Sequence, residues 1–324
     1  MNSTGPFLEK LADVKQPISL WRHNPEFDRH IEGLIEWTLL EQEKFGWDFV
    51  KVTATGTALC EPFNVTTELV DDDVGTTRIS DSSYTELDAL SSLEREFPLD
   101  FHDQQWPIVA TGEVRRYLKP EIPVMATLFT PETMIAKLTG GKNMQWDVMS
   151  PAYVNAITYF QQLLGLQVAQ LKSDGVDAVF LASQVSNRDY LNEGANKARI
   201  VRERERAAQR LINGFGLNCF YHIHGRLPHL DAFNDSLHTR AITHWHIDEA
   251  PVKIDSVRSY NDHRLSGGIP RDLCSPDSNK ERISGYVKNN KITDQDIFIS
   301  PSCTMNRHSS DELMTFTKEK IKGS

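Results

Sequence analysis

The feature that most constrains the fold of this chain is a series of eight short apolar runs separated by longer amphipathic stretches. Each run is rich in β-branched or aromatic residues and is mostly apolar on both faces, as expected for strands of a parallel sheet covered on both sides. The runs lie at residues 18–21, 48–53, 124–129, 177–182, 218–223, 242–247, 264–269 and 296–301. Because parallel strands need long crossover connections, usually helices, this alternation predicts an α/β fold.

The stretches between the runs predict helices, most clearly at residues 30–45, 149–175 and 309–321. The second has apolar side chains at three- and four-residue steps and ends at Gly175, a residue type that commonly terminates helices. Eight strand–helix units in 324 residues predict a (β/α)8 TIM barrel forming a single domain over residues 1–324. A doubly wound open sheet is the alternative. No GxGxxG motif follows an early strand, so neither that fold nor a nucleotide cofactor is indicated.

Residues 70–120 do not follow the alternation. The stretch "DDDVGTTRISDSSYTELDALSSLEREF" within them is acidic and rich in serine and threonine. We expect an excursion from the barrel with short helices here, rather than a second domain.

Composition and charge narrow the function classes. The chain carries a formal net charge of −10, with 39% hydrophobic and 25% charged residues, as in globular proteins. Its most basic segment, residues 197–210, mixes charges at helical spacing, so nucleic acid and anionic membranes are not expected partners. We find no secretory leader and no apolar run as long as a membrane span. The four cysteines are widely spaced, which favours free thiols in a cytoplasmic protein.

Histidines are concentrated in one region, with seven of the eleven between residues 222 and 263. His222 and His224 end one predicted strand, and His244 and His246 end the next. Residues two apart on a strand point to the same face, and functional side chains of such barrels gather at the C-terminal strand ends. Cys303 follows the last predicted strand, so these groups could converge as a zinc site with an open position. Alternatively, the histidines are ordinary residues satisfied by neighbouring carboxylates.

Further polar residues fall at the first two predicted strands. Arg22 and His23 follow the first, and Asp48 and Lys51 belong to the second. The plainest interpretation of Arg22 is a salt bridge with a nearby acidic residue of its own loop, Glu26 or Asp28.

Five segments in the same order resemble the uroporphyrinogen decarboxylase superfamily over most of the chain. They are "PISLWRHNPEF", "FGWDFVKVTATGTALCEPFN", "PVMATLFTPETMIAKLTGG", "LSGGIPRDL" and "IFISPSCTMNRHSSDELMTF". The resemblance implies a (β/α)8 barrel and makes a homodimer plausible.

The decarboxylases of this superfamily carry an RQAGRY motif whose arginines bind substrate carboxylates without a cofactor. This chain has "WRHNPEF" there, so Arg22 matches and the second arginine does not. A tetrapyrrole with many carboxylates needs several cationic partners. A metal-free decarboxylase acting on a porphyrinogen or a smaller carboxylate through Arg22 and Asp48 therefore stays an alternative.

The zinc methyltransferases of the superfamily, notably the corrinoid-to-coenzyme M enzymes, resemble the chain more closely. Their H-x-C-G and S-P-G-C elements bind zinc. The matching positions here are His222, His224 in place of cysteine, Gly225, and Cys303 in "SPSC". An imidazole in place of a thiolate makes the site one charge more positive and more Lewis acidic, which keeps iron and hydrolytic or carbonyl chemistry open.

The leading hypothesis is a zinc enzyme that moves a methyl group onto or from a small thiol or amine, with His222, His224 and Cys303 as ligands. Arg22 and Lys51, together with His23, would bind an acidic group of the substrate. Asp48 would orient them or transfer protons. His244 and His246 would be proton-relay or supporting groups, and His244 would also contribute to substrate binding.

The sequence also leaves two alternative functions open and suggests one partner protein. A non-catalytic barrel that serves as a binding module would fail to bring its histidines and cysteine together. An unrelated hydrolase with paired His-x-His strands is disfavoured, because amidohydrolase-like barrels carry their first pair on strand one. No cobalamin-binding DxHxxG element occurs, so corrinoid-dependent chemistry would need a separate methyl-carrier protein.

Overall fold

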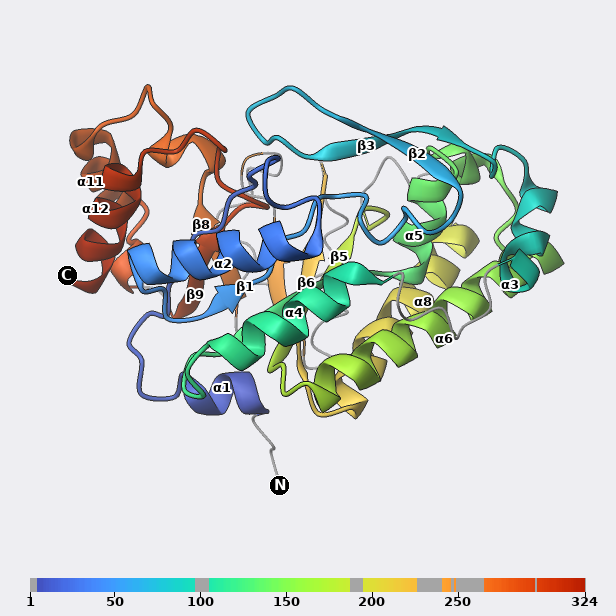
Figure 1. The fold of residues 1–324 in the computed structure, drawn as a ribbon, viewed down its shortest axis with the longest axis horizontal. Coiled ribbons are helices and arrows are strands. Elements are labelled where there is room, and N and C mark those ends of the chain that lie inside the picture. The colour runs from blue at the N-terminus through green and yellow to red at the C-terminus, as the bar shows by residue number, and fades with distance from the viewer. Residues whose placement is uncertain are drawn as a thin grey trace.

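The computed structural model describes residues 5–96, 105–186, 195–225, 241–245, 248, 265–294 and 296–323. Its centre is a curled sheet of seven parallel strands in the order β1-β4-β5-β6-β7-β8-β9 (Figure 1). Their bounds are β1 Val50–Lys51, β4 Val124–Phe129, β5 Ala178–Ser183, β6 Asn218–Ile223, β7 Ile242–Trp245, β8 Leu265–Ile269 and β9 Ile297–Pro301. Seven of the eight predicted strands are thereby confirmed, and the α/β class with them.

The predicted first strand, residues 18–21, forms isolated bridges instead of a regular strand. Ile18 bridges Ile299 of β9, and Arg22 bridges Met305 beyond it. On the other side, the Asp48 amide donates to the Ile18 carbonyl at 3.1 Å, so this segment lies between β9 and β1. The Ile18 amide donates to the Asp48 carboxylate at 2.8 Å rather than to a backbone carbonyl, which interrupts the ladder. The sheet therefore has seven strands where the sequence predicts eight.

Helices follow most strands and pack against the outer face of the sheet. The α-helices are α1 Pro6–Lys10, α2 Ile31–Phe45, α3 Leu93–Glu96, α4 Trp106–Tyr117, α5 Pro131–Leu138, α6 Pro151–Ser173, α8 Ala195–Gly214, α11 Lys280–Asn289 and α12 Asp311–Lys322. Short 3-10 turns are η1 Leu87–Ser92, η3 Lys142–Gln145, η4 Arg271–Cys274 and η5 Ile292–Asp294. No helix among the described residues is both long and apolar enough to cross a membrane.

Local sequence signals explain where the main helices begin and end. The hydroxyls of Thr130, Ser150 and Ser310 each accept an amide hydrogen bond from the first turn of the helix that follows. α2 ends at Gly46, whose φ of 57° is a left-handed conformation that glycine adopts without strain. The predicted helices at residues 30–45, 149–175 and 309–321 correspond to α2, α6 and α12 to within two residues.

An antiparallel hairpin that was not predicted from the sequence begins just before the excursion around residues 70–120 and extends into it. Its strands are β2 Val65–Leu69 and β3 Thr77–Ser82. Asp72 starts the turn, because its carboxylate accepts from the amides of Val74 and Gly75. The acidic residues of the turn favour a loop. The two strands are polar and partly exposed, so they lack the apolar pattern that identifies the strands of the central sheet.

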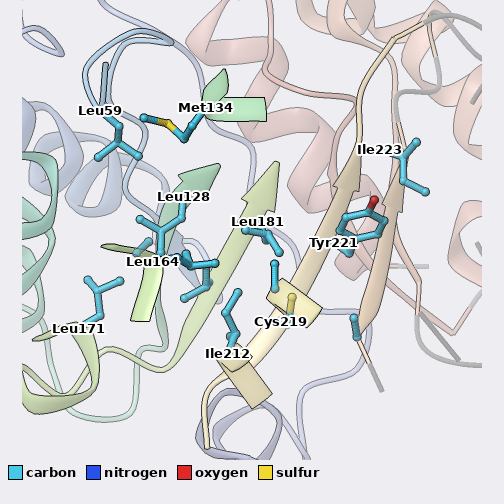
Figure 2. Packing of buried hydrophobic residues seen from close by; sticks show 14 of the residues in the cluster. Leu59, Leu128, Met134, Leu164, Leu171, Leu181, Ile212, Cys219, Tyr221 and Ile223 are labelled. Carbon is cyan, nitrogen blue, oxygen red and sulfur yellow. The ribbon is translucent and has the colours of Figure 1, made fainter. Parts of the chain in front are cut away.

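Outward-facing side chains of the sheet form the largest core. Figure 2 shows this layer, in which Leu128 of β4, Leu181 of β5 and Tyr221 of β6 pack with residues of α5, α6 and α8. Successive strand residues point to opposite faces, so the alternate residues of the same strands point inward.

The inward-facing side chains fill the N-terminal half of the curled sheet with aromatic rings. Phe7 of α1 contacts Phe49, Phe220 and Phe298 at ring-centroid distances of 5.3, 4.9 and 5.8 Å. Asn218, the first residue of β6, accepts a hydrogen bond from the Phe7 amide at 3.2 Å. We call these four phenylalanines the aromatic plug. Among the described residues, the plug occupies the N-terminal end of the interior.

Candidate metal centre

A cavity of about 380 Å³ lies at the C-terminal ends of the central strands. Its wall includes Phe129 at the end of β4, Ala182 near the end of β5, His222 near the end of β6 and Cys303 two residues after β9. This is the end at which barrel-type α/β folds place functional side chains. The cavity therefore occupies the position that the strand pattern predicts for a site.

Three potential metal ligands converge on this cavity. One ligand atom from each of His222, His224 and Cys303 lies within 4.8 Å of the others. The His224 amide donates to the Ser183 carbonyl at 2.9 Å, which continues the β5–β6 ladder and keeps both histidines on the inner face. Two imidazoles and one thiolate with room for a fourth ligand fit a catalytic zinc ion.

The hydrogen bonds behind His222 prepare it as a ligand. His244 is 0% exposed, and its Nε2 lies 3.0 Å from the Pro301 carbonyl oxygen, which can only accept. His244 in its neutral form must therefore carry its proton on Nε2 and accept at Nδ1. Nδ1 of His222 lies 2.8 Å away and donates to it. This leaves the Nε2 lone pair of His222 for a metal ion, the arrangement that supporting groups commonly impose on ligating histidines.

Two lysines provide positive charge in the same cavity. Lys51 has its Nζ 4.6 Å from the ring centroid of Phe180 and 5.0 Å from that of Trp21, and it donates to the Thr53 hydroxyl at 3.0 Å. Burial lowers the pKa of Lys51 to about 7, although the nearby Cys303 thiolate raises it in part.

Lys137 of α5 lies with its Nζ 4.6 Å from the Phe129 ring centroid, and burial lowers its pKa as well. Neither Lys51 nor Lys137 forms an ion pair with a carboxylate in the part of the chain that the structure describes. An anionic group that entered the cavity would therefore meet two buried amines that form no ion pair with a carboxylate among those residues.

Arg22 does not line this cavity, which differs from the expectation. It is 8% exposed, and its guanidinium pairs with Glu41 of α2 at 2.9 Å and with Asp311 of α12 at 2.6 Å. It also donates to the Ser309 carbonyl at 2.5 Å. The physical reason is the alternation of side chains, which directs Arg22 outward while its neighbour His23 faces inward.

Asp48 also lies away from the cavity. It precedes β1 and so sits at the N-terminal end of the strand, whereas Lys51 reaches the other end. Its carboxylate accepts from the Ile18 amide and pairs with Lys322 at 2.7 Å. The structure therefore brings Lys51, His23 and the three ligands together, and leaves Arg22 and Asp48 outside. His246, the remaining predicted residue, lies outside the described residues.

The sequence analysis missed Lys137 and Arg271 on the cavity wall, and Asp28 behind it. Lys137 is an ordinary-looking lysine in an amphipathic helix, so no local signal distinguishes it. Arg271 lies two residues after the end of β8, so a strand-end rule could have identified it. Asp28 follows His23 by five residues in a turn, a spacing without a regular pattern.

Comparisons with known proteins support the fold. No protein-family model matches the chain, and no curated protein matches it. Among solved structures, a methyltransferase from Methanosarcina mazei superimposes with a TM-score of 0.76 at 15% sequence identity, covering 99% of this chain and 91% of that chain. A structure of the pneumococcal virulence factor StrH aligns with a TM-score of 0.48 at 11% identity over 98% of this chain and 85% of that chain, too distant to inform the argument. The first likeness shows that this chain shares the α/β fold of that methyltransferase.

Proposed function

We propose that this protein is a metal-dependent methyltransferase of the uroporphyrinogen decarboxylase superfamily. It transfers a methyl group onto or from a small thiol, or an amine, that carries an acidic group. The observation that carries the proposal is the convergence of His222, His224 and Cys303 in a cavity at the C-terminal strand ends. The fold shared with a methyltransferase from Methanosarcina mazei supports it.

The three ligands would hold zinc, with iron as the alternative metal. Such an ion would supply Lewis acidity, which lowers the pKa of a thiol and keeps its sulfur in a reactive form at neutral pH. The histidine at position 224 makes this site one charge more positive than a ligand set with two thiolates, which favours an anionic substrate.

The remaining residues of the cavity bind and orient the substrate. Lys51 and Lys137 bind its acidic group by charge-assisted hydrogen bonds. The rings of Phe129 and Phe180 form an apolar wall that excludes water next to the ligands. The methyl group would come from a separate carrier protein of the corrinoid type, and the whole chain would act as one cytoplasmic barrel domain, alone or as a homodimer.

The geometry disfavours the alternatives. A metal-free decarboxylase depends on Arg22 and Asp48, both of which lie outside the cavity and are held in other ion pairs. A non-catalytic binding module predicts that the histidines and cysteine stay apart, whereas their ligand atoms lie within 4.8 Å of one another.

The test is elemental analysis of the purified protein beside the variants Cys303→Ser and His222→Ala. We expect about one zinc or iron per chain in the wild type and a large loss in both variants, because three protein ligands are needed for a stable site. His308→Gln is the matched control, since this histidine lies outside the ligand set and should leave the metal content unchanged.

Metal-loaded protein is then assayed for methyl transfer from methylcobalamin to small acidic thiols. Wild-type protein without stoichiometric metal, or variants that keep it, would contradict the proposal.

A further inference from the structure

His23 lies on the wall of the cavity that contains the three ligands. It also lines a second cavity of about 430 Å³, whose wall includes the exposed Glu26 and the loop residues Arg307 and His308. We call these the inner and outer cavities. His23 therefore stands between the candidate metal centre and the surface of the molecule.

Backbone pairing places His23 beside the loop that carries Cys303. Arg22 bridges Met305, and the Met305 amide donates to the Trp21 carbonyl at 2.8 Å. The Thr304 hydroxyl donates to the same carbonyl at 3.2 Å. These two segments run side by side, and Cys303 lies on the second of them. The contacts between the segments therefore fix the positions of both His23 and Cys303.

A buried carboxylate orients the imidazole of His23. Nδ1 of His23 lies 2.6 Å from Oδ2 of Asp28, and the Asn24 amide donates to the same oxygen at 3.2 Å. Asp28 is 0% exposed, and among the described residues its Oδ1 has no hydrogen-bond partner. An ionised carboxylate only accepts, so Nδ1 of His23 carries a proton and Nε2 is the nitrogen that can exchange one.

This pair has the elements of a proton acceptor. A desolvated carboxylate with few donors stabilises a positive charge on the imidazole next to it. Other charged groups on the walls of the two cavities are Lys51, Lys137, Asp72 and Arg271 on the inner side and Glu26, Arg307 and His308 on the outer side. Asp28 is the carboxylate that contacts the ring directly in the structure.

We propose that His23 accepts the proton that a thiol substrate loses when it binds at the His222, His224 and Cys303 site, with Asp28 as its positioning residue. In this step the S–H bond breaks and its electron pair stays on sulfur, while a new N–H bond forms at Nε2 of His23. The imidazolium is balanced by Asp28, so the proton stays on the protein while the thiolate is bound. This inference rests on the proposed function.

The experiment measures how many protons the protein releases to the buffer when a thiol binds. Zinc-loaded protein is titrated with 2-mercaptoethanol, which has no carboxylate to draw a proton onto Lys51, by calorimetry in buffers of different ionisation heat at about pH 8.5. We expect the wild type to release clearly less than one proton per thiol to the buffer. His23→Gln should release more, because the proton then lacks the acceptor that His23 provides. His308→Gln, a histidine on the outer cavity only, should behave like the wild type.

The variant Asp28→Asn tests whether Asp28 acts on His23 through its charge or only through packing. The amide keeps the side-chain shape and can still accept from Asn24, but it cannot balance an imidazolium, so its proton count should move toward that of His23→Gln. This variant also carries the test if His23→Gln does not fold.

Equal proton release by the wild type and both variants would overturn the role of His23. Absence of 3-mercaptopropionate binding to the zinc-loaded wild type at about pH 6, where Lys51 is charged, would instead overturn the proposed function, and this inference with it.

Discussion

At the scale of single residues, His244 is the side chain whose surroundings most narrowly define its role. It bonds a backbone carbonyl on one side and His222 on the other, and both histidines are buried against the ring of Phe180. From the sequence we expect substrate binding, a proton relay or a supporting role for His244, and its hydrogen bond to His222 fits the supporting role. Its contribution should therefore appear in metal affinity.

Replacing His244 with phenylalanine should weaken zinc binding about 10–100-fold, the usual cost of removing a group that supports a metal-bound histidine. Phenylalanine fills much of the volume but cannot accept from His222, so the ligand's tautomer is no longer fixed. Competition with a chromophoric chelator measures the dissociation constant. His30→Gln, at a well-exposed histidine, serves as control. Unchanged zinc affinity in His244→Phe would refute this role.

Lys51→Met should lower the affinity for 3-mercaptopropionate about 10–100-fold and leave 2-mercaptoethanol binding nearly unchanged, since a hydrogen bond to a charged group contributes about 1.5–3 kcal/mol. Because burial lowers the pKa of Lys51 to about 7, the wild-type amine loses its charge as the pH rises through that value. Affinity for the acidic thiol should thus fall between about pH 6 and pH 8, around the value where this lysine titrates.

Lys51→Met should lack that part of the pH dependence. Titration calorimetry across this range measures both effects. An equal loss of affinity for the neutral thiol would show that Lys51 shapes the cavity rather than binding the acid.

At the scale of elements, Arg22 joins two helices that are far apart in the sequence. Its guanidinium contacts Glu41 of α2, Asp311 at the start of α12 and the carbonyl of Ser309 before it. These contacts fasten the C-terminal helix to the segment that lies between β9 and β1. They assign Arg22 to the stability of the fold rather than to substrate binding.

Arg22→Met should lower the free energy of unfolding by about 3 kcal/mol, because it leaves the buried Glu41 carboxylate without its partner. The double variant Arg22→Met/Glu41→Leu removes both charges and should recover much of this loss. Urea denaturation measures the stability, and zinc content should be unchanged in both proteins. If Arg22→Met were fully stable but unable to bind an acidic thiol, the sequence-based role of Arg22 in substrate binding would be restored.

At the scale of the whole molecule, the sequence predicts the parallel sheet well because burial on both faces produces apolar runs that no turn or surface helix imitates. It predicts the convergence of His222, His224 and Cys303, because their positions follow from strand ends and from side-chain alternation. No such rule identifies Asp28 or Lys137. Asp28 lies on a turn and Lys137 on α5, and tertiary packing brings both to the cavity. The hairpin of β2 and β3 is not predicted from the sequence for a related reason, because its polar strands lack an apolar run.

The aromatic plug divides the interior of the sheet along its axis. On β6 the inward residues are Asn218 near α1, Phe220 within the plug and His222 at the cavity. Inside the sheet, aromatic packing is thus concentrated at one end and the candidate metal centre lies at the other, with different residues at each. The two ends can therefore vary independently, because a change at the candidate centre, such as cysteine in place of His224, leaves every ring of the plug in place.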